Sequence, residues 1–434
     1  MKKTLTTLAM ITMAGGLITA CGSSGGGNTS SKSSNSGNNT VSQSGGGSSS
    51  TSASGALVIA VAAPFSGNES FIGPRFLNGV KVAVNEINAN GGILGKQLKI
   101  VTADTAGDPV DAVPAISQIV STKHPVAMIG PSSLTITSVA NQLNQDKLVD
   151  VTLGGTTQLD QMNFKYIFRT SPSDSQLGVA MAYYGNQKGY KKVALAFTSD
   201  DAAQTLVPPI QKAVKGHGGQ VVSNVQLAPD QSSYRSEIEK IISSKPDVVY
   251  TQMDPQTAST FVSEWQQLGG GNVPFVGSDV TAAGDFIKAV TPAWAAKDLT
   301  SIQGSTAGGN AATEYAQFYG QVFSGQQPVT LSNDAYDAMN IIALAMLEAK
   351  STDPSVYVDD IVKAANGPGT NVYDFKSGAA DIQKGQTINY QGAGGPQDFN
   401  QYHNVTGAFE AVQSDGAKNL KTVGNISPQN LLGY

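Results

Sequence analysis

Short apolar runs alternate with segments of helical periodicity from residue 56 onward. Residues 56–63 form a continuous apolar run, which predicts a strand buried on both faces. Phe76, Val80, Val84 and Ile87 then recur at helical spacing, and the sequence Asn-Ala-Asn-Gly-Gly that follows predicts the end of that helix. The same patterns predict a helix over 110–122 and further strands over 97–103, 126–129, 149–153 and 166–169.

A second series of the same kind begins near residue 175. Its predicted helices cover 175–188, 206–215, 234–243 and 257–268, and its predicted strands cover 191–198, 221–227, 248–253 and 273–277. Alternation of strands and helices predicts parallel sheets with helices on both faces, and two such series predict two lobes. The fold class is therefore expected to be α/β, with two doubly wound, Rossmann-like lobes. A long amphipathic helix over 333–350 and a glycine-rich, strand-and-loop end from about 386 complete the prediction.

The first 20 residues have the features of a secretory signal peptide. Lys2 and Lys3 precede a short apolar run over 5–18, and small residues then lead to Cys21. This order resembles the bacterial lipobox, so Cys21 is expected to be lipidated and to anchor the chain outside the cytoplasm. Cys21 is the only cysteine in the chain, so no intrachain disulfide is expected. A buried free cysteine is the alternative.

Residues 22–55 are almost entirely Ser, Gly, Asn and Thr. This composition buries too little apolar surface to fold, so residues 21–55 are predicted to be a lipidated tether with a span of about 30 Å.

Composition and motifs argue against several classes of function. The net charge is −5 and only 14% of residues are charged, without the basic clusters of a nucleic-acid-binding protein. His124, His217 and His403 lack the spacing of metal ligands. The glycines at 269–271 end a predicted helix, and residues 304–308 lack a central serine, so neither stretch is a nucleotide or nucleophile motif. We expect no cofactor, no metal and no enzymatic activity.

Several segments, in order along the chain, resemble the branched-chain amino acid binding protein family. They are PFSG at 64–67, Gly73, VAVNEINANGGILGKQLKIVTADTAGDP at 82–109, IGP at 129–131, FRTSPSD at 168–174, NDAYDA at 333–338 and YQGAGGPQDFN at 390–400. The resemblance implies the type I periplasmic-binding fold, with two lobes, a hinge of three crossing strands and a ligand between the lobes. It implies crossings near 172–176, 300–306 and 395–400. The lobes are then 56–173 with 304–395, and 174–303 with 396–434.

Loops at the carboxyl ends of the first-lobe strands are the expected ligand contacts, because ligands of open α/β sheets bind there. The loops are 65–75, 131–136 and 154–157, and their candidate residues are Phe71, Arg75, Ser133, Thr135, Gly155, Thr156 and Thr157. By the resemblance, Thr157 contacts a ligand carboxylate and Gly155 offers backbone contacts. Ser132 either contacts the ligand or caps the following helix. Arg75 either clamps a carboxylate or pairs with a neighbouring acid.

The second lobe supplies Asp279, which the resemblance places at the ligand ammonium, and Asp254 at the end of another strand. Each either faces the ligand or caps a turn. Leu134 stands where the family often has serine, and small residues at 201–203 replace an aromatic wall, so the ligand need not be leucine, isoleucine or valine.

The expected function is that of a solute-binding protein of an ABC importer, which passes an amino acid or similar small polar ligand to its permease and ATPase subunits. The expected form is a membrane-anchored monomer that binds no nucleic acid. A ligand-sensing receptor and an amide-processing regulator of the same fold are the alternatives.

Overall fold

The computed structural model describes residues 55–305, 309–417 and 419–434, which belong to one compact unit. The predicted signal peptide, Cys21 and nearly all of the predicted tether lie outside the described residues. No helix of the described part combines the length and apolar character needed to cross a bilayer.

The first lobe is built on a five-stranded parallel sheet of order β2-β1-β3-β4-β5. Its strands are β1 (Leu57–Ala63), β2 (Leu98–Asp104), β3 (Ala127–Ile129), β4 (Asp150–Thr152) and β5 (Ile167–Arg169). In β1, Ile59 and Val61 pack on one face, whereas Ala60 and Ala62 pack on the other. This two-sided burial explains the continuous apolar run in the sequence.

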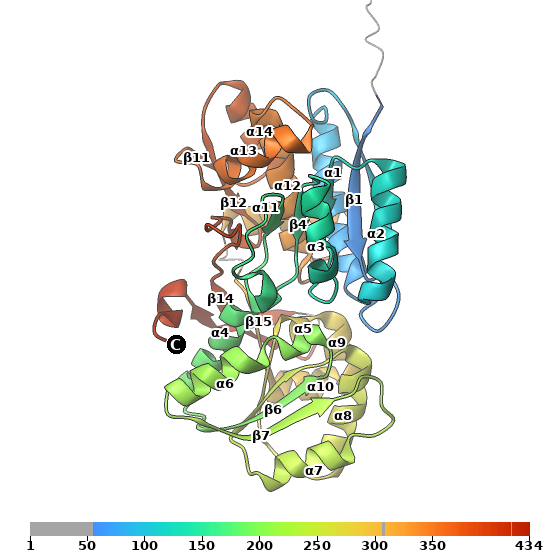
Figure 1. The fold of residues 1–434 in the computed structure, drawn as a ribbon. Helices are drawn as coiled ribbons and strands as arrows, with labels where there is room; N and C mark the ends of the chain where they lie inside the picture. The colour runs from blue at the N-terminus through green and yellow to red at the C-terminus, as the bar shows by residue number, and fades with distance from the viewer. Residues whose placement is uncertain (1–54, 306–308, 418) are drawn as a thin grey trace, which may run out of the picture. The chain divides into compact units, whose positions relative to one another are not determined.

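Helices cover both faces of this sheet (Figure 1). One face packs against α1 (Gly73–Ala89), α11 (Asn310–Val322), α12 (Ser332–Glu348), α13 (Pro354–Asn366) and α14 (Phe375–Gln383). The other face packs against α2 (Pro109–Lys123) and α3 (Ile136–Gln145). A small sheet of β11 (Thr370–Val372), β12 (Ile388–Gly392) and β13 (Gly395–Pro396) lies beside α13 and α14.

The second lobe contains a seven-stranded sheet of order β15-β14-β10-β9-β8-β6-β7. Its strands are β6 (Lys192–Thr198), β7 (Gln220–Leu227), β8 (Val248–Gln252), β9 (Phe275–Gly277), β10 (Leu299–Gly304), β14 (Phe409–Ser414) and β15 (Leu420–Ile426). The strands from β6 to β10 are parallel, and β14 and β15 add an antiparallel edge.

Two apolar clusters cover the faces of the second sheet. The helices on one face are α4 (Asp174–Gln187), α5 (Asp201–Gln204) and α6 (Val207–Gly216); those on the other are α7 (Arg235–Ser243), α8 (Pro255–Gln267), α9 (Gly284–Ala289) and α10 (Pro292–Asp298). Short 3-10 turns occur at η1 (Thr157–Leu159), η2 (Asp279–Ala282) and η3 (Pro428–Leu431).

Three chain segments connect the lobes. The first joins β5 to α4, and the second joins β10, which ends at Gly304, to α11, which begins at Asn310. The third lies later than the predicted 395–400, because Phe399 and Val405 are both in the core of the first lobe and Asn404 bridges to Arg169 of β5. The chain enters the second lobe only at β14, so residues 396–405 pack with the first lobe.

Candidate functional site

A cavity of about 310 Å³ lies between the two lobes. Residues that follow β3, β4 and β5 line it from the first lobe, and the ends of β8, β9 and β10 line it from the second. The site therefore occupies the carboxyl ends of both sheets, as in other open α/β folds. Its volume is at the lower end of the range of about 300–1,000 Å³ for small-molecule sites.

The first-lobe wall combines apolar side chains with hydroxyl groups. Ile72, Phe76 and Leu153 contribute apolar surface, and Ser132 and Ser133 lie directly after β3. Ser132 is only 5% exposed, and its hydroxyl has no hydrogen-bond partner among the described residues. This hydroxyl is available to a ligand.

Gly155 brings the first-lobe wall against the start of α4. Its carbonyl accepts a hydrogen bond of 2.7 Å from the Asp174 backbone N–H. A Cβ atom at position 155 would overlap the Asp174 carboxylate. Glycine is needed here because the two chain segments approach so closely.

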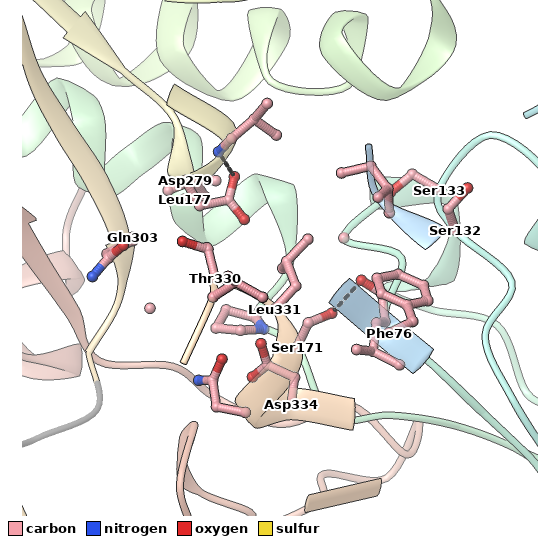
Figure 2. Close-up of a pocket in the computed structure, with 18 of the residues that line it drawn as sticks. Phe76, Ser132, Ser133, Ser171, Leu177, Asp279, Gln303, Thr330, Leu331 and Asp334 are labelled. Carbon is pink, nitrogen blue, oxygen red and sulfur yellow. Dashed lines mark hydrogen bonds between the residues drawn. The ribbon is translucent and has the colours of Figure 1, made fainter. Parts of the chain in front are cut away.

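Four carboxyl side chains line the cavity: Glu69, Asp174, Asp279 and Asp334. Asp334 lies in the first turn of α12 and is 6% exposed. Figure 2 shows Asp279 and Asp334 reaching the cavity from different elements, and the Asp279 carboxylate accepts a hydrogen bond of 2.9 Å from the backbone N–H of Val280. The four acids come from separate parts of the sequence and meet only in the folded chain.

Burial raises the pKa of all four acids. Burial, and then the charges of Asp200 and Asp254, raise the pKa of Glu69 to about 8. Burial together with the charge of Asp279 raises the pKa of Asp174 to about 7, although Thr205 donates a hydrogen bond of 2.6 Å to it.

The pKa of Asp279 is also raised by burial, and burial with the charges of Asp337 and Asp279 holds that of Asp334 well above its ordinary value. The negative charges in the cavity are thus poorly solvated and repel one another.

Arg75 pairs with an acid of the opposite lobe. Its Nη2 donates to both carboxylate oxygens of Asp285, at 2.7 and 2.8 Å, and its guanidinium group lies 5.0 Å from the centre of the Phe71 ring. Of the two alternatives for Arg75, the structure supports pairing with a neighbouring acid, and Arg75 does not line the cavity.

The other candidates from the sequence divide into two groups. Ser133, Gly155 and Asp279 line the cavity, whereas Thr135, Thr156 and Thr157 do not. The Thr156 side chain instead accepts a hydrogen bond from the Gln158 N–H and caps η1, the turn in which Thr157 is the first residue.

Phe71 and Asp254 line a neighbouring cavity of about 380 Å³. One oxygen of Asp254 caps α8 by accepting from the N–H groups of Gln256 and Thr257, and the other is buried without a partner among the described residues. Asp254 therefore caps a helix, and it lines the neighbouring cavity rather than the first one.

Sequence reasoning missed Glu69, Asp174 and Asp334 as site residues. Glu69 is in the predicted loop 65–75, and the other two are in the segments FRTSPSD and NDAYDA that carry the family resemblance. For Asp174 and Asp334, the signal in the sequence was an acid at the start of a predicted helix. An acid at this position is equally typical of a helix N-terminus that binds no ligand.

Comparison with known proteins agrees with this architecture. The periplasmic binding protein family model matches residues 56–419. An amino acid binding protein of Pseudomonas aeruginosa is 29% identical over 197 residues, which are 45% of this chain and 53% of that protein. A Leu/Ile/Val-binding protein of Rhizobium johnstonii is 24% identical over 76% of this chain and 84% of its own length. The chain thus spans about half the length of the first relative and most of the second.

Solved structures share the fold. A leucine binding protein of Thermotoga maritima superposes with a TM-score of 0.74 at 20% identity, over 86% of this chain and 99% of that one. A branched-chain amino acid transporter substrate binding protein of Streptococcus pneumoniae, in complex with isoleucine, gives a TM-score of 0.71 at 20% identity over the same shares of the two chains.

These matches confirm the type I periplasmic-binding fold predicted from the sequence, a fold of extracytoplasmic solute-binding proteins rather than enzymes. The chain belongs to the periplasmic binding protein family.

Proposed function

We propose that this protein is the lipid-anchored solute-binding subunit of an ABC importer, and that it closes its lobes on an amino acid or similar small polar ligand. The observation that carries the proposal is the cavity lined by both lobes at the carboxyl ends of their sheets. A ligand that contacts both walls favours the closed form over the open form. The closed form then presents surfaces of both lobes together to the permease.

The chemistry of the cavity wall and the names of the relatives support a small polar ligand. Ser132, Ser133 and the loop at Gly155 offer groups for a polar or anionic end, and Asp279 offers a carboxylate for an amine. The relatives named above are amino acid binding proteins, but a solute binding protein of R. palustris that shares the fold, with a TM-score of 0.72 at 18% identity, was solved in complex with benzoate. Fold alone does not fix the ligand.

The ligand site is tested by Asp279→Ala. We expect at least tenfold weaker binding by calorimetry, with thermal unfolding of the ligand-free protein little changed, because a cleft carboxylate contributes little to the core. Asp381→Ala, which removes an acid outside the cavity, is the matched control and should bind as the parent does. Unchanged affinity in the Asp279 variant would refute the site.

Closure and anchoring have their own tests. Small-angle scattering should show contraction of the purified protein on addition of its ligand, and an unchanged radius of gyration at saturating ligand would contradict the closing mechanism. The variant Cys21→Ser should move the protein from the membrane fraction to the soluble fraction after export. Retention in the membrane would refute the lipid anchor.

A further inference from the structure

The carboxyl groups of the cavity have few basic partners. The cavity is lined by Glu69, Asp174, Asp279 and Asp334, and among the described residues no lysine, arginine or histidine lines it. The basic side chain whose charge acts on Glu69 and Asp279 is Arg75, which is already paired with Asp285. In their ionised forms the four acids therefore gain little compensation from the protein, apart from the charge of Arg169 at Asp174, and a bound cation would favour those ionised forms.

The Asp334 carboxylate has little support from the protein. It is 6% exposed, and among the described residues the donor that acts on it is the N–H group of its own backbone. A buried carboxylate with so few donors is costly to ionise. The carboxylate lies where a bound cation would contact it directly (Figure 2).

The neighbouring cavity extends the acidic surface. Glu69, Gln252 and Val280 line both cavities, so the two are adjacent. The second one also receives Asp108, Asp111, Asp200 and Asp254. A cleft lined by charges of one sign concentrates and guides ions of the opposite sign.

A metal ion does not fit this arrangement. In residues 55–305, 309–417 and 419–434, no three acids, histidines or cysteines are close enough together to hold a metal ion. Leu177, Leu331 and Phe409 line the same cavity, so it offers apolar surface as well as carboxyl groups. Carboxyl groups together with apolar surface match an organic cation whose charges are joined by methylene groups.

We propose that the cavity binds a small organic cation with two positively charged nitrogen groups, one on the carboxylates of Asp279 and Asp174 and the other on Asp334. This inference rests on the proposed function and narrows its ligand. A neutral zwitterion such as leucine carries a single positive charge and brings a carboxylate of its own, so it offers the acids of the cavity no net positive charge. Free diamines and basic amino acids both have two cationic groups, and the hydroxyls of Ser132 and Ser133 serve a carboxylate where the ligand has one.

The experiment is calorimetry of the purified protein with three probes: 1,4-diaminobutane, lysine and leucine. We expect at least one of the two probes with two ammonium groups, here called the dications although lysine also carries a carboxylate, to bind tenfold or more tightly than leucine, with an affinity that falls as salt is added. Tighter binding of diaminobutane would indicate a free diamine as the ligand, and tighter binding of lysine would indicate a basic amino acid. Asp174→Asn and Asp334→Asn should each weaken the dication at least tenfold.

Asp334→Asn also separates a ligand role from a structural one. Because the substitution keeps the shape of the side chain and removes only its ability to ionise, we expect the melting temperature of the ligand-free protein not to fall while affinity falls. A structural carboxylate would give a lower melting temperature. Asp359→Asn, in an exposed ion pair with Lys165, is the matched control and should change neither value.

The outcomes distinguish this inference from the proposed function. Leucine bound more tightly than both dications would overturn the inference and leave an amino acid binding protein. If none of the three probes binds, the inference is overturned as well. The proposed function would then be tested by small-angle scattering of the protein with other small polar solutes, where contraction would support it. A lower melting temperature in Asp334→Asn with unchanged dication affinity would also overturn the inference.

Discussion

The ion pair between Arg75 and Asp285 connects the two lobes, and Asp285→Asn breaks its charge interaction. Arg75 belongs to α1 of the first lobe and Asp285 to α9 of the second. The Arg75 side chain is 6% exposed, whereas that of Asp285 is 42% exposed. The variant leaves the buried guanidinium group of Arg75 without its counter-charge. The resulting loss of free energy applies only to the closed form, in which the two lobes are in contact.

The size of the effect follows from this asymmetric burial. Exposed ion pairs contribute about 0–1 kcal/mol, and breaking a fully buried pair costs about 3–5 kcal/mol. With one buried and one half-exposed partner, we expect about 2 kcal/mol. Since about 1.4 kcal/mol corresponds to a factor of ten, the ratio of closed to open form should fall about 30-fold. Ligand affinity falls with the population of the binding-competent form.

The assay combines calorimetry with small-angle scattering of the ligand-free protein. Asp285→Asn should bind ligand up to about 30-fold more weakly and should show a larger radius of gyration than the parent. Asp359→Asn removes an exposed ion pair within the first lobe, with a parent distance of 2.9 Å, and should change neither quantity. If Asp285→Asn keeps both the affinity and the radius of the parent, the contact is not a link that favours closure.

Three other predictions test packing and electrostatics. Gly155→Ala should displace the Asp174 carboxylate, lower the unfolding free energy by about 1–3 kcal/mol and weaken ligand binding. Gly216→Ala, which adds a methyl group in open space, is the control and should change neither the unfolding free energy nor the ligand affinity. Trp265→Ala, which truncates a side chain 2% exposed in the second-lobe core, should cost about 3–5 kcal/mol in denaturant unfolding without changing the affinity of the folded protein. Burial raises the pKa of Glu69 to about 8 and that of Asp174 to about 7, whereas both pKa values are about 4 in the unfolded chain. The contribution of these two groups to stability is therefore complete below about pH 4 and is lost as pH rises through 7 to 8. The melting temperature of the ligand-free protein should therefore fall more steeply between pH 5 and 8 than that of a variant with Gln and Asn at these two positions, and equal slopes would contradict the assignment.

The fold was largely predictable because its sheets are buried on both faces. Apolar runs such as 56–63 and the helical repeat from Phe76 to Ile87 give local signals that match β1 and α1. The third crossing was misplaced because Phe399 and Val405 are isolated apolar residues in a loop-like, glycine-rich region. Their packing in the first core depends on contacts with distant segments, which the local pattern does not contain.

The site was only partly predictable, for a related reason. Ser133, Gly155 and Asp279 follow predicted strands, and the carboxyl ends of parallel strands meet at one edge of a sheet. Asp334 follows no strand and reaches the cavity because α12 packs against α1. Which of two adjacent hydroxyls faces a cavity is likewise set by local turns, as the capping of η1 by Thr156 shows.

The acids that define the cavity also bear on how the lobes move. Asp334 belongs to the first lobe and Asp279 to the second, and the charge of Asp279 is one of the causes that raise the pKa of Asp334. Closure without a ligand therefore brings the carboxyl groups of Asp279 and Asp334 together in a poorly solvated space, and repulsion between their ionised forms opposes closure. Arg75 and Asp285 attract each other across the same cleft and favour closure. A cation between the acids converts the repulsion into attraction on both sides, and its differential affinity for the closed form supplies the free energy of closing. In this arrangement the charge of the ligand determines both which solute is bound and whether the lobes close.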